Sequence, residues 1–378
     1  MTAADPGLLM TIASFLLVIG PLIFVHELGH YFVARWFGVK AETFSIGFGR
    51  EIGGWTDRRG TRWKIGWLPL GGYVKFAGDM NPASSPTDEW LSLPPERRAE
   101  TFQAKPLWQR FLIVLAGPAT NFLFAILAFM AIFGTIGYPT TPAVVHGVVE
   151  AGAADRAGFR PGDRIVAADG RGIEIFADLQ GYVSLRPAQS IRFTVERDGE
   201  RLRIPVVTGE TIARDSFGNE ARLGSLGVTS GPPTYARLAP PALLGASVSQ
   251  TIDTVRAMVT GLGQIITGQR SVKEMGGPLK IAQYSGQQAS LGWVEFFWFM
   301  TVISINLGFI NLLPIPLLDG GHLLFYLVEG VRRKPLKPEA QEWAFRTGLA
   351  ALLALMIFVT LNDLASFGVW TKLGGLIG

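Results

Sequence analysis

Long apolar runs dominate the sequence, and they predict segments that cross a membrane. A helix needs about 20 largely apolar residues to span the hydrocarbon core of a bilayer. Four such runs lie approximately between Leu8 and Phe37, Phe111 and Gly137, Phe296 and Val328, and Ala344 and Phe367. Polar residues interrupt the first and third runs. The pattern therefore predicts an α-helical polytopic membrane protein with about four transmembrane helices.

Alternating apolar and polar positions between Val144 and Val207 predict a β-rich domain inserted after the second run. Ala153–Gly158, followed by Arg160–Ile165, resembles the core motif of bacterial PDZ domains, and Asp169-Gly170 is typical of a tight hairpin turn. A generic small β-domain is the alternative interpretation. We expect a PDZ-like domain over residues 138–230, interfacial or docking helices over residues 231–295, and the two halves of a membrane core at residues 1–137 and 296–378.

A second alternating pattern lies in the loop that follows the first run. Arg62–Phe76 contains two alternating stretches joined by Leu68-Pro-Leu-Gly-Gly72, which predicts a membrane-associated β-hairpin. The free edge of such a hairpin can accept an extended peptide as an added strand. Gly71, Gly72 and Tyr73 are therefore candidate substrate-binding residues. A simple surface hairpin without that role is the alternative.

Composition supports a membrane protein and excludes several other classes. Apolar residues make up 48% of the chain and charged residues 17%, whereas about 25% is usual for soluble proteins. The net charge of +4 comes from dispersed basic residues, so no nucleic-acid partner is expected. The absence of Cys excludes disulfides and thiolate metal ligands. Met1–Gly7 contains no Lys or Arg, so we interpret the first run as a retained span and not as a cleaved signal peptide.

Basic loops predict the orientation of the chain. The loop between Arg35 and Arg110 is rich in Lys and Arg, and the short loop Arg332–Glu339 is strongly basic. Both lie on the same side if all predicted segments span, and the positive-inside rule assigns that side to the cytoplasm. The inserted domain and both chain termini are then expected to be extracytoplasmic.

The first apolar run contains His26-Glu-Leu-Gly-His30, the pattern H-E-x-x-H. Two histidines four residues apart project from one helix face and can bind one zinc ion, and Glu27 is placed to accept a proton from the attacking water. The alternative is a pair of hydrogen-bonded core histidines. Ionisable residues inside a spanning segment are costly and usually functional, so we predict a metal site.

A third protein ligand is expected in the third run. Asp319 is the only acidic residue between Phe296 and Val328, and an unpaired carboxylate there is costly. The segment Pro314-Ile-Pro316 is expected to break the helix, and Gly320-Gly321 to loosen the chain after the Asp. Such irregular backbone implies surrounding protein or a water-filled cavity. His322 is a rival third ligand, and the chemistry of the residues leaves both open.

Two asparagines lie in the same apolar run as Asp319, and a third lies in the second run. Asn306 and Asn311 are candidates for binding the substrate backbone or a tetrahedral oxyanion. They can equally satisfy the carbonyl groups that the prolines release. Asn121, with Gly117-Pro118, is assigned to helix packing or bending.

These motifs together resemble the site-2 protease family, in the branch of the bacterial regulator of sigma-E protease. The resemblance rests on H-E-L-G-H, on Asn311–Gly320, on the PDZ-like motif, on Gly117–Asn121 and on Trp67–Gly78. It covers most of the chain and implies that Asp319 is the third ligand of a Zn²⁺ ion. Members of this branch often carry two PDZ domains in tandem, whereas this sequence shows one PDZ-like unit.

The resemblance implies a zinc metalloendopeptidase of a bacterial inner membrane that cuts transmembrane segments of single-pass proteins. Its expected substrates are anti-sigma-factor-like proteins after a first extracytoplasmic cut and remnant signal peptides. The PDZ-like domain would capture a new peptide C-terminus or exclude bulky substrates. The alternatives are a non-proteolytic PDZ-bearing adaptor with a vestigial metal site and a soluble-type metalloprotease anchored by helices. Nothing suggests the inverted repeats of a transporter.

Overall fold

The computed structural model describes residues 6–78, 90, 92–214, 220–272 and 276–366. These residues divide into two compact units. The first consists of residues 6–129 and 276–363, and the second mainly of residues 130–275. Each unit is described separately below.

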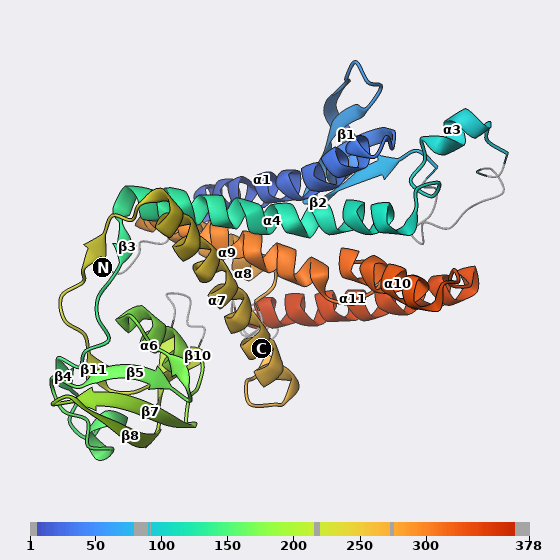
Figure 1. Cartoon of the computed structure of the whole chain (residues 1–378). Coiled ribbons are helices and arrows are strands. Elements are labelled where there is room, and N and C mark those ends of the chain that lie inside the picture. The colour runs from blue at the N-terminus through green and yellow to red at the C-terminus, as the bar shows by residue number, and fades with distance from the viewer. Residues whose placement is uncertain (1–5, 79–89, 91, 215–219, 273–275, 367–378) are drawn as a thin grey trace, which may run out of the picture. The chain divides into compact units, whose positions relative to one another are not determined.

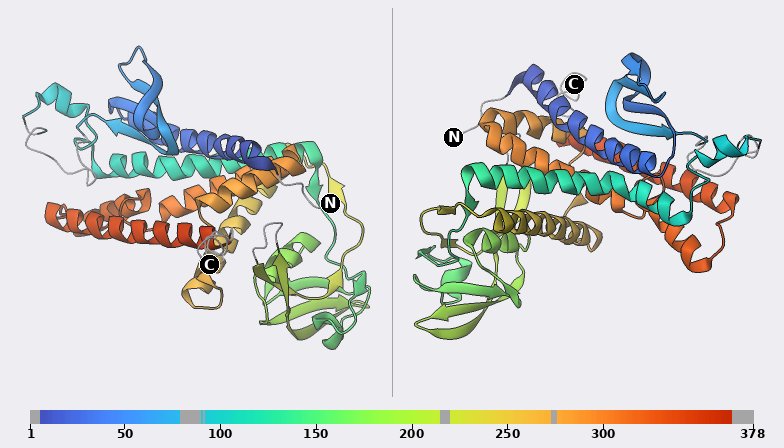
Figure 2. Two further views of the ribbon diagram at one scale, coloured as in Figure 1. Left: turned by 180° about the vertical axis from the view of Figure 1, so that it is seen from behind. Right: turned by 45° about the horizontal axis from the view of Figure 1, so that its top comes forward.

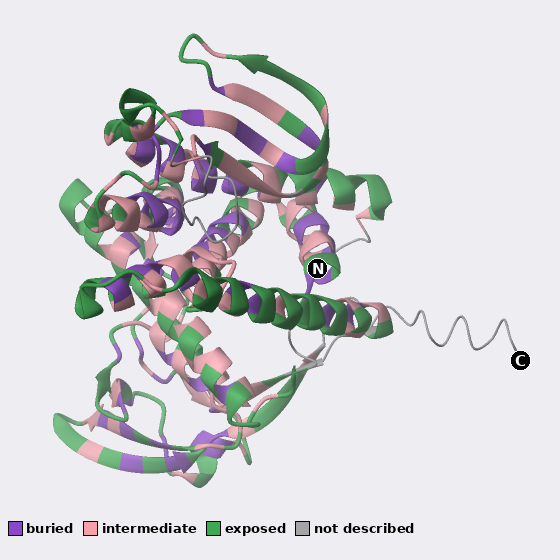
Figure 3. Ribbon diagram, turned by 90° about the vertical axis from the view of Figure 1, so that its right-hand side faces the viewer, coloured by how far each residue is buried: buried purple, intermediate pink, exposed green. Residues whose placement is uncertain are grey.

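The structure contains several long helices (Figure 1). Four of them are long and apolar enough to cross a membrane: α1 (Gly7–Trp36), α4 (Leu107–Ile136), α9 (Trp293–Leu312) and α11 (Pro338–Ser366). Many of their large apolar side chains are exposed, and α11, which leads to the end marked C in Figure 3, is green over most of its length. A helix surface of that kind is stable against lipid rather than water. The prediction of four apolar spans is confirmed.

The third predicted segment is two helices with an irregular connection. α9 ends at Leu312, and α10 begins at Asp319 and continues to Arg332. The connection contains both prolines, which cannot donate to a helix ladder, so the predicted break is confirmed. The predicted role of Gly320-Gly321 is wrong, because both glycines are buried in the first turn of α10. A Cβ on Gly320 would lie 2.2 Å from the Leu313 carbonyl oxygen, so these glycines permit a close return of the chain rather than loosening it.

The hairpin also differs from its prediction. Its strands are β1 (Ala41–Thr56) and β2 (Arg62–Phe76), and the turn between them lies at residues 57–61. The two alternating stretches of β2 do not pair with each other: residues 62–65 and 72–75 both pair with residues 43–46 of β1, and residues 62–65 also pair with residues 53–56. A strand can pair along both of its edges. Residues 43–46 use one edge for each stretch, so they lie between the two stretches in the sheet. Among the described residues, 72–76 pair with no other strand and form an edge.

The first unit is held together by a hydrophobic cluster around the C-terminal part of α1. Tyr31, Phe44, Phe76, Ile113 and Tyr326 are buried together in it. They come from α1, β1, β2, α4 and α10, so the hairpin packs on the same side chains that join the helices. In two views α1 and α4 run side by side (Figures 1 and 2). The helix α8 (Pro278–Leu291) packs along α1, where a Cβ on Gly286 would lie 2.7 Å from the Thr11 hydroxyl.

The second unit contains a small β-rich domain. Its main sheet has the strand order β6-β5-β7-β8, with smaller strand pairs beside it. The strands are β3 (Tyr138–Pro139), β4 (Gly147–Val148), β5 (Arg164–Ala168), β6 (Arg171–Gly172), β7 (Ser190–Arg197), β8 (Glu200–Val207), β9 (Gly209–Arg214), β10 (Glu220–Ser225), β11 (Val228–Thr229) and β12 (Tyr235–Ala236). Asp169 and Gly170 have φ of 49° and 84° and join β5 to β6, so the predicted hairpin turn is confirmed.

Two short helices and one long helix complete this unit. They are α5 (Ala153–Arg156), α6 (Phe176–Ser184) and α7 (Pro240–Ile266), while α3 (Pro95–Ala99) belongs to the first unit. Within the domain, Asp163 is fully buried and accepts two hydrogen bonds from Arg197, at 2.6 and 2.7 Å. Burial alone would raise the pKa of Asp163, but the Arg197 guanidinium outweighs it and holds that pKa below its usual range.

Candidate metal centre

His26, Glu27 and His30 lie in α1, a helix long and apolar enough to cross a membrane. His26 and Glu27 are buried, with 7% and 9% of their surface exposed. His26 lies ten residues before the helix end at Trp36, a distance of about 15 Å at 1.5 Å per residue. The spacing of four residues turns both imidazoles to the same face, as their contact distance of 3.3 Å between Nε2 atoms shows.

Asp319 meets the two histidines because the break in the third segment lets α10 begin beside α1. Its Oδ2 lies 3.1 Å from His26 Nε2 and 3.5 Å from His30 Nε2. Three atoms that each sit about 2.0–2.1 Å from the centre of a tetrahedron are about 3.3 Å apart. The three separations in the structure, 3.1, 3.3 and 3.5 Å, therefore match a tetrahedral zinc site.

The donor set itself also fits a cation. Asp319 Oδ2 is buried and makes no hydrogen bond of regular geometry, although two ring nitrogens lie beside it. Three converging electron-pair donors without protons between them would repel one another, and a divalent ion removes that repulsion. Among the described residues, His26, His30 and Asp319 are the side chains whose ligand atoms converge closely enough to hold one metal ion. His322 is directed elsewhere: its ring lies 5.1 Å from that of Phe345 and 6.4 Å from that of Tyr326.

The α4 helix supplies none of these donors but contacts both imidazoles. The Ile113 carbonyl oxygen lies 2.9 Å from His30 Nδ1, and the Asn121 side chain lies 3.0 Å from His26 Nδ1. In each ring the Nδ1 is thus occupied by α4, which leaves Nε2 to face Asp319. Hydrogen bonds of this kind fix the orientation of metal-binding histidines.

Two glycines allow α1 and α4 to approach this closely. A Cβ on Gly29 would lie 2.4 Å from the Ala116 carbonyl oxygen, and one on Gly117 would lie 2.2 Å from His30 Nε2. The Thr120 hydroxyl further donates to the Val25 carbonyl oxygen across the same contact, at 3.0 Å. Small residues at such contacts are typical of membrane helices.

The β1–β2 hairpin packs against Glu27. A Cβ on Gly72 would lie 3.1 Å from Glu27 Cγ and 2.7 Å from Ile23 Cγ2, so the edge strand of β2 passes directly over the acid. Gly71 has φ of 127°, and a Cβ there would meet the ring of Phe48 at 2.4 Å. Tyr73 stacks on the same ring with centroids 6.1 Å apart. Of the three predicted peptide-binding residues, the structure thus brings Gly72 to Glu27, whereas Gly71 and Tyr73 contact Phe48.

Asn306 and Asn311 lie on the last turns of α9 and are half-buried. Ser304, two residues before Asn306, is fully buried and donates a hydrogen bond to the Asn121 carbonyl oxygen at 2.9 Å. This end of α9 is therefore joined to the part of α4 that contacts His26.

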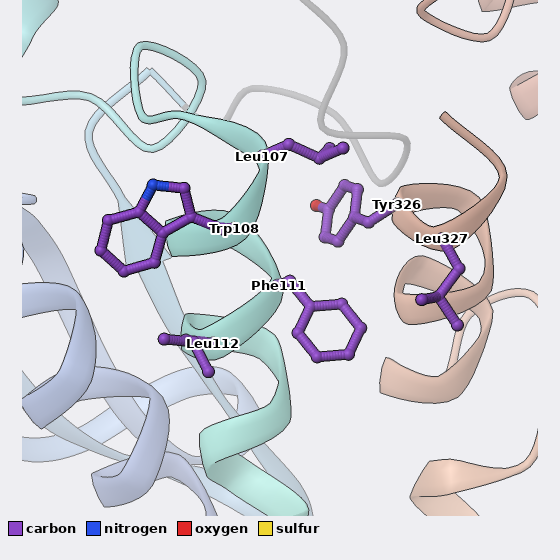
Figure 4. Close-up of a pocket in the computed structure, with 6 residues that line it drawn as sticks. All are labelled: Leu107, Trp108, Phe111, Leu112, Tyr326 and Leu327. Atoms are coloured by element: carbon purple, nitrogen blue, oxygen red, sulfur yellow. The ribbon is translucent and has the colours of Figure 1, made fainter. Parts of the chain in front are cut away.

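A separate apolar pocket of about 500 Å³ opens between α4 and α10 (Figure 4). The pocket is lined by Leu107, Trp108, Phe111, Leu112, Tyr326 and Leu327. No acidic residue or histidine lines it, so it does not contain the candidate chemistry.

Comparison with known proteins agrees with this donor set. The profile of the family "Peptidase family M50" matches residues 14–355. A protein of Agrobacterium fabrum with a provisional zinc metalloprotease name is 44% identical over 94% of this chain and 96% of its own length. A similarly named protein of Rhizobium meliloti is 43% identical over 94% and 96%. The metalloprotease MmpA of Caulobacter vibrioides is 39% identical over 98% of this chain and 99% of its own length. With a family match across nearly all of its length and such relatives, the chain belongs to peptidase family M50, a family of zinc metalloproteases.

Proposed function

We propose that the protein is a zinc-dependent intramembrane endopeptidase that hydrolyses peptide bonds within the transmembrane segments of single-pass membrane proteins. The observation that carries the proposal is the depth of the donor set. His26, Glu27 and His30 lie within a helix long and apolar enough to span a bilayer, and all three are buried or nearly so. A protease that worked on soluble peptides would not need its ionisable groups in that position, where they are costly.

In this proposal His26, His30 and Asp319 hold the zinc ion. When bound, zinc supplies a Lewis acid that activates water and polarises the scissile carbonyl. Glu27 acts as general base and later as general acid: its carboxylate accepts the proton of the attacking water and delivers it to the leaving amine. The side chains around Glu27 exclude bulk water and so strengthen each electrostatic interaction at the site.

A substrate helix must lose its internal hydrogen bonds before its carbonyl groups can react. The unpaired edge at residues 72–76 offers backbone groups that can hold the unwound segment as an added strand beside Glu27. Gly71, Gly72 and Tyr73 are the binding residues at this edge. Asn306 and Asn311 are proposed to bind substrate backbone or the oxyanion, or else to satisfy the carbonyls released at Pro314 and Pro316.

The β-rich domain is proposed to be PDZ-like, extracytoplasmic and selective for trimmed substrates. Its support is the PDZ-like sequence motif and the hairpin turn at Asp169-Gly170. The proposed location is a bacterial inner membrane, with the metal centre toward the cytoplasmic side, as the basic residues near Arg332 favour. Anti-sigma-factor-like proteins and signal-peptide remnants are the proposed substrates, and regulated intramembrane proteolysis is the proposed process.

The proposal is tested with the purified protein in lipid nanodiscs and a single-pass reporter whose spanning segment contains helix-destabilising residues. We expect cleavage inside the spanning segment, mapped by mass spectrometry of both fragments, with loss of activity on zinc chelation and recovery on adding zinc. An adaptor with a vestigial site would give no fragments. An anchored soluble-type protease would instead cut a matched reporter only in its water-exposed parts.

The placement of the hairpin predicts the effect of Gly72→Val. The new side chain would collide with Ile23 and Glu27, so it would displace the edge strand from the general base. Misplacement of about 1 Å at a reacting centre costs about 100-fold in rate. We expect cleavage of the reporter to fall by that order, while the zinc content of the protein is unchanged.

Gly53→Val is the matched control, because Gly53 lies in β1 of the same hairpin and a Cβ there would meet no atom within 4 Å. It should retain cleavage. Equal loss in both variants would show that hairpin stability, and not the contact with Glu27, controls the rate.

A further inference from the structure

A buried amide outside the proposed ligand set contacts the metal centre. Asn121 lies in the middle of α4 and is 0% exposed. Its side chain lies 3.0 Å from His26 Nδ1, and its backbone carbonyl is held by Ser304 of α9. A polar side chain buried in a membrane helix needs a partner, and the side chain of Asn121 contacts the His26 imidazole.

The two imidazoles are held by chemically different groups. His30 Nδ1 faces the Ile113 carbonyl oxygen, which can only accept a hydrogen bond, so His30 is fixed with its proton on Nδ1 and its lone pair on Nε2. His26 Nδ1 faces an amide, which offers an oxygen acceptor or an NH₂ donor according to its rotation. The tautomer of His26 is therefore set by which end of Asn121 faces the ring.

Zinc binding through Nε2 selects one of these arrangements. His26 Nε2 is the atom that lies 3.1 Å from Asp319 Oδ2, so Nε2 must carry the lone pair and Nδ1 the proton. Asn121 must then present its oxygen to Nδ1. In the structure the amide nitrogen Nδ2 lies 3.0 Å from His26 Nδ1, and Oδ1 is buried without a hydrogen-bond partner. A half-turn of the amide exchanges the two atoms, brings the oxygen to Nδ1 and gives that oxygen a partner.

We propose that Asn121 is a positioning residue that sets the tautomer and orientation of His26 for zinc binding. The inference rests on the proposed function, because it assigns a role toward the zinc ion of that site. It adds a role toward His26 to the helix packing or bending that the sequence predicts for Asn121. A packing role would need only the volume of the side chain, whereas a positioning role needs an acceptor at His26 Nδ1.

The test compares Asn121→Leu, which keeps the approximate volume and removes the acceptor, with Asn121→Asp, which keeps an acceptor. Zinc affinity is measured on the full protein in nanodiscs by competition with a chromophoric chelator. We expect about 10–100-fold weaker zinc binding for Asn121→Leu, as is usual when such a partner of a ligand histidine is lost. Asn121→Asp should bind zinc at least as well as the wild type.

The tautomer is observed directly by ¹⁵N NMR of the histidine side chains, which is feasible because the chain has 4 histidines. We expect the zinc-loaded wild type and Asn121→Asp to carry the His26 proton on Nδ1, and Asn121→Leu to show mixed tautomers when zinc-free. Ser304→Ala is the control: it removes the hydrogen bond to the Asn121 backbone and leaves the amide side chain in place.

Wild-type zinc affinity in Asn121→Leu would overturn the inference. If that variant does not fold, Asn121→Asp decides, because a tenfold loss of zinc affinity in an acceptor-bearing variant would also overturn it. A different result would contradict the proposed function itself: the absence of zinc binding in both the wild type and Glu27→Gln.

Discussion

Replacing Glu27 with Gln is expected to remove nearly all proteolysis while leaving the zinc site intact. Gln has the size of Glu but cannot accept the proton of the attacking water at neutral pH. Loss of a general acid–base group lowers rates by about 10²–10⁴-fold. Glu27 is not one of the three converging donors, so its replacement should not release the ion. The measurement pairs the single-turnover cleavage rate of the single-pass reporter with the zinc content of the same sample.

Glu42→Gln is the control for this experiment. Glu42 lies in β1 with its side chain 42% exposed and forms an ion pair with Lys75 at 2.9 Å. Exposed pairs of this kind contribute about 0–1 kcal/mol, so the rate and the fold should both be retained. Cleavage by Glu27→Gln at the wild-type rate would disprove the assigned chemistry, even if zinc is present.

The parts of the site that follow local periodicity could be predicted from the sequence. His26 and His30 share a helix face because a helix has 3.6 residues per turn, and that relation does not depend on the rest of the fold. The break between α9 and α10 was equally local, because proline lacks the donor that a helix requires. Both predictions are confirmed by the helix bounds and by the His26–His30 contact.

The parts that depend on long-range packing could not be predicted. Alternation in β2 identified strand-forming residues, but it carries no information about which strand pairs with them, so β1 was missed as the partner. The chemistry of the residues left both Asp319 and His322 open as the third ligand, and the choice of Asp319 came from the family resemblance; in the structure it is Asp319, at the start of α10, that lies beside the two histidines. Asn121 is 95 residues from His26 in the chain. The available signal was a lone amide in an apolar run, which indicates a buried partner but does not name it.

Gly117→Ala is expected to disrupt the metal centre through a single methyl group. The new Cβ would lie 2.2 Å from His30 Nε2, the atom that faces Asp319. The ring cannot turn aside without cost, because its Nδ1 is held by the Ile113 carbonyl of the same helix, one turn away. Overpacking of this kind costs about 1–3 kcal/mol, which corresponds to about 5–150-fold in zinc affinity. The loss is measured by chelator competition, and proteolysis should fall with it.

Gly134→Ala is the matched control, because it lies on the same helix and its Cβ would meet only the Leu243 side chain, at an ordinary distance of 3.7 Å. Gly to Ala within a helix stabilises by about 0.5–1 kcal/mol, so this control should show unchanged zinc affinity and an equal or higher melting temperature. Gly117→Ala should instead lose zinc even if its helix is stabilised. If Gly117→Ala kept the wild-type zinc affinity, close packing of α4 against His30 would not control the metal site. The assignment of α4 as the helix that orients both imidazoles would then be wrong.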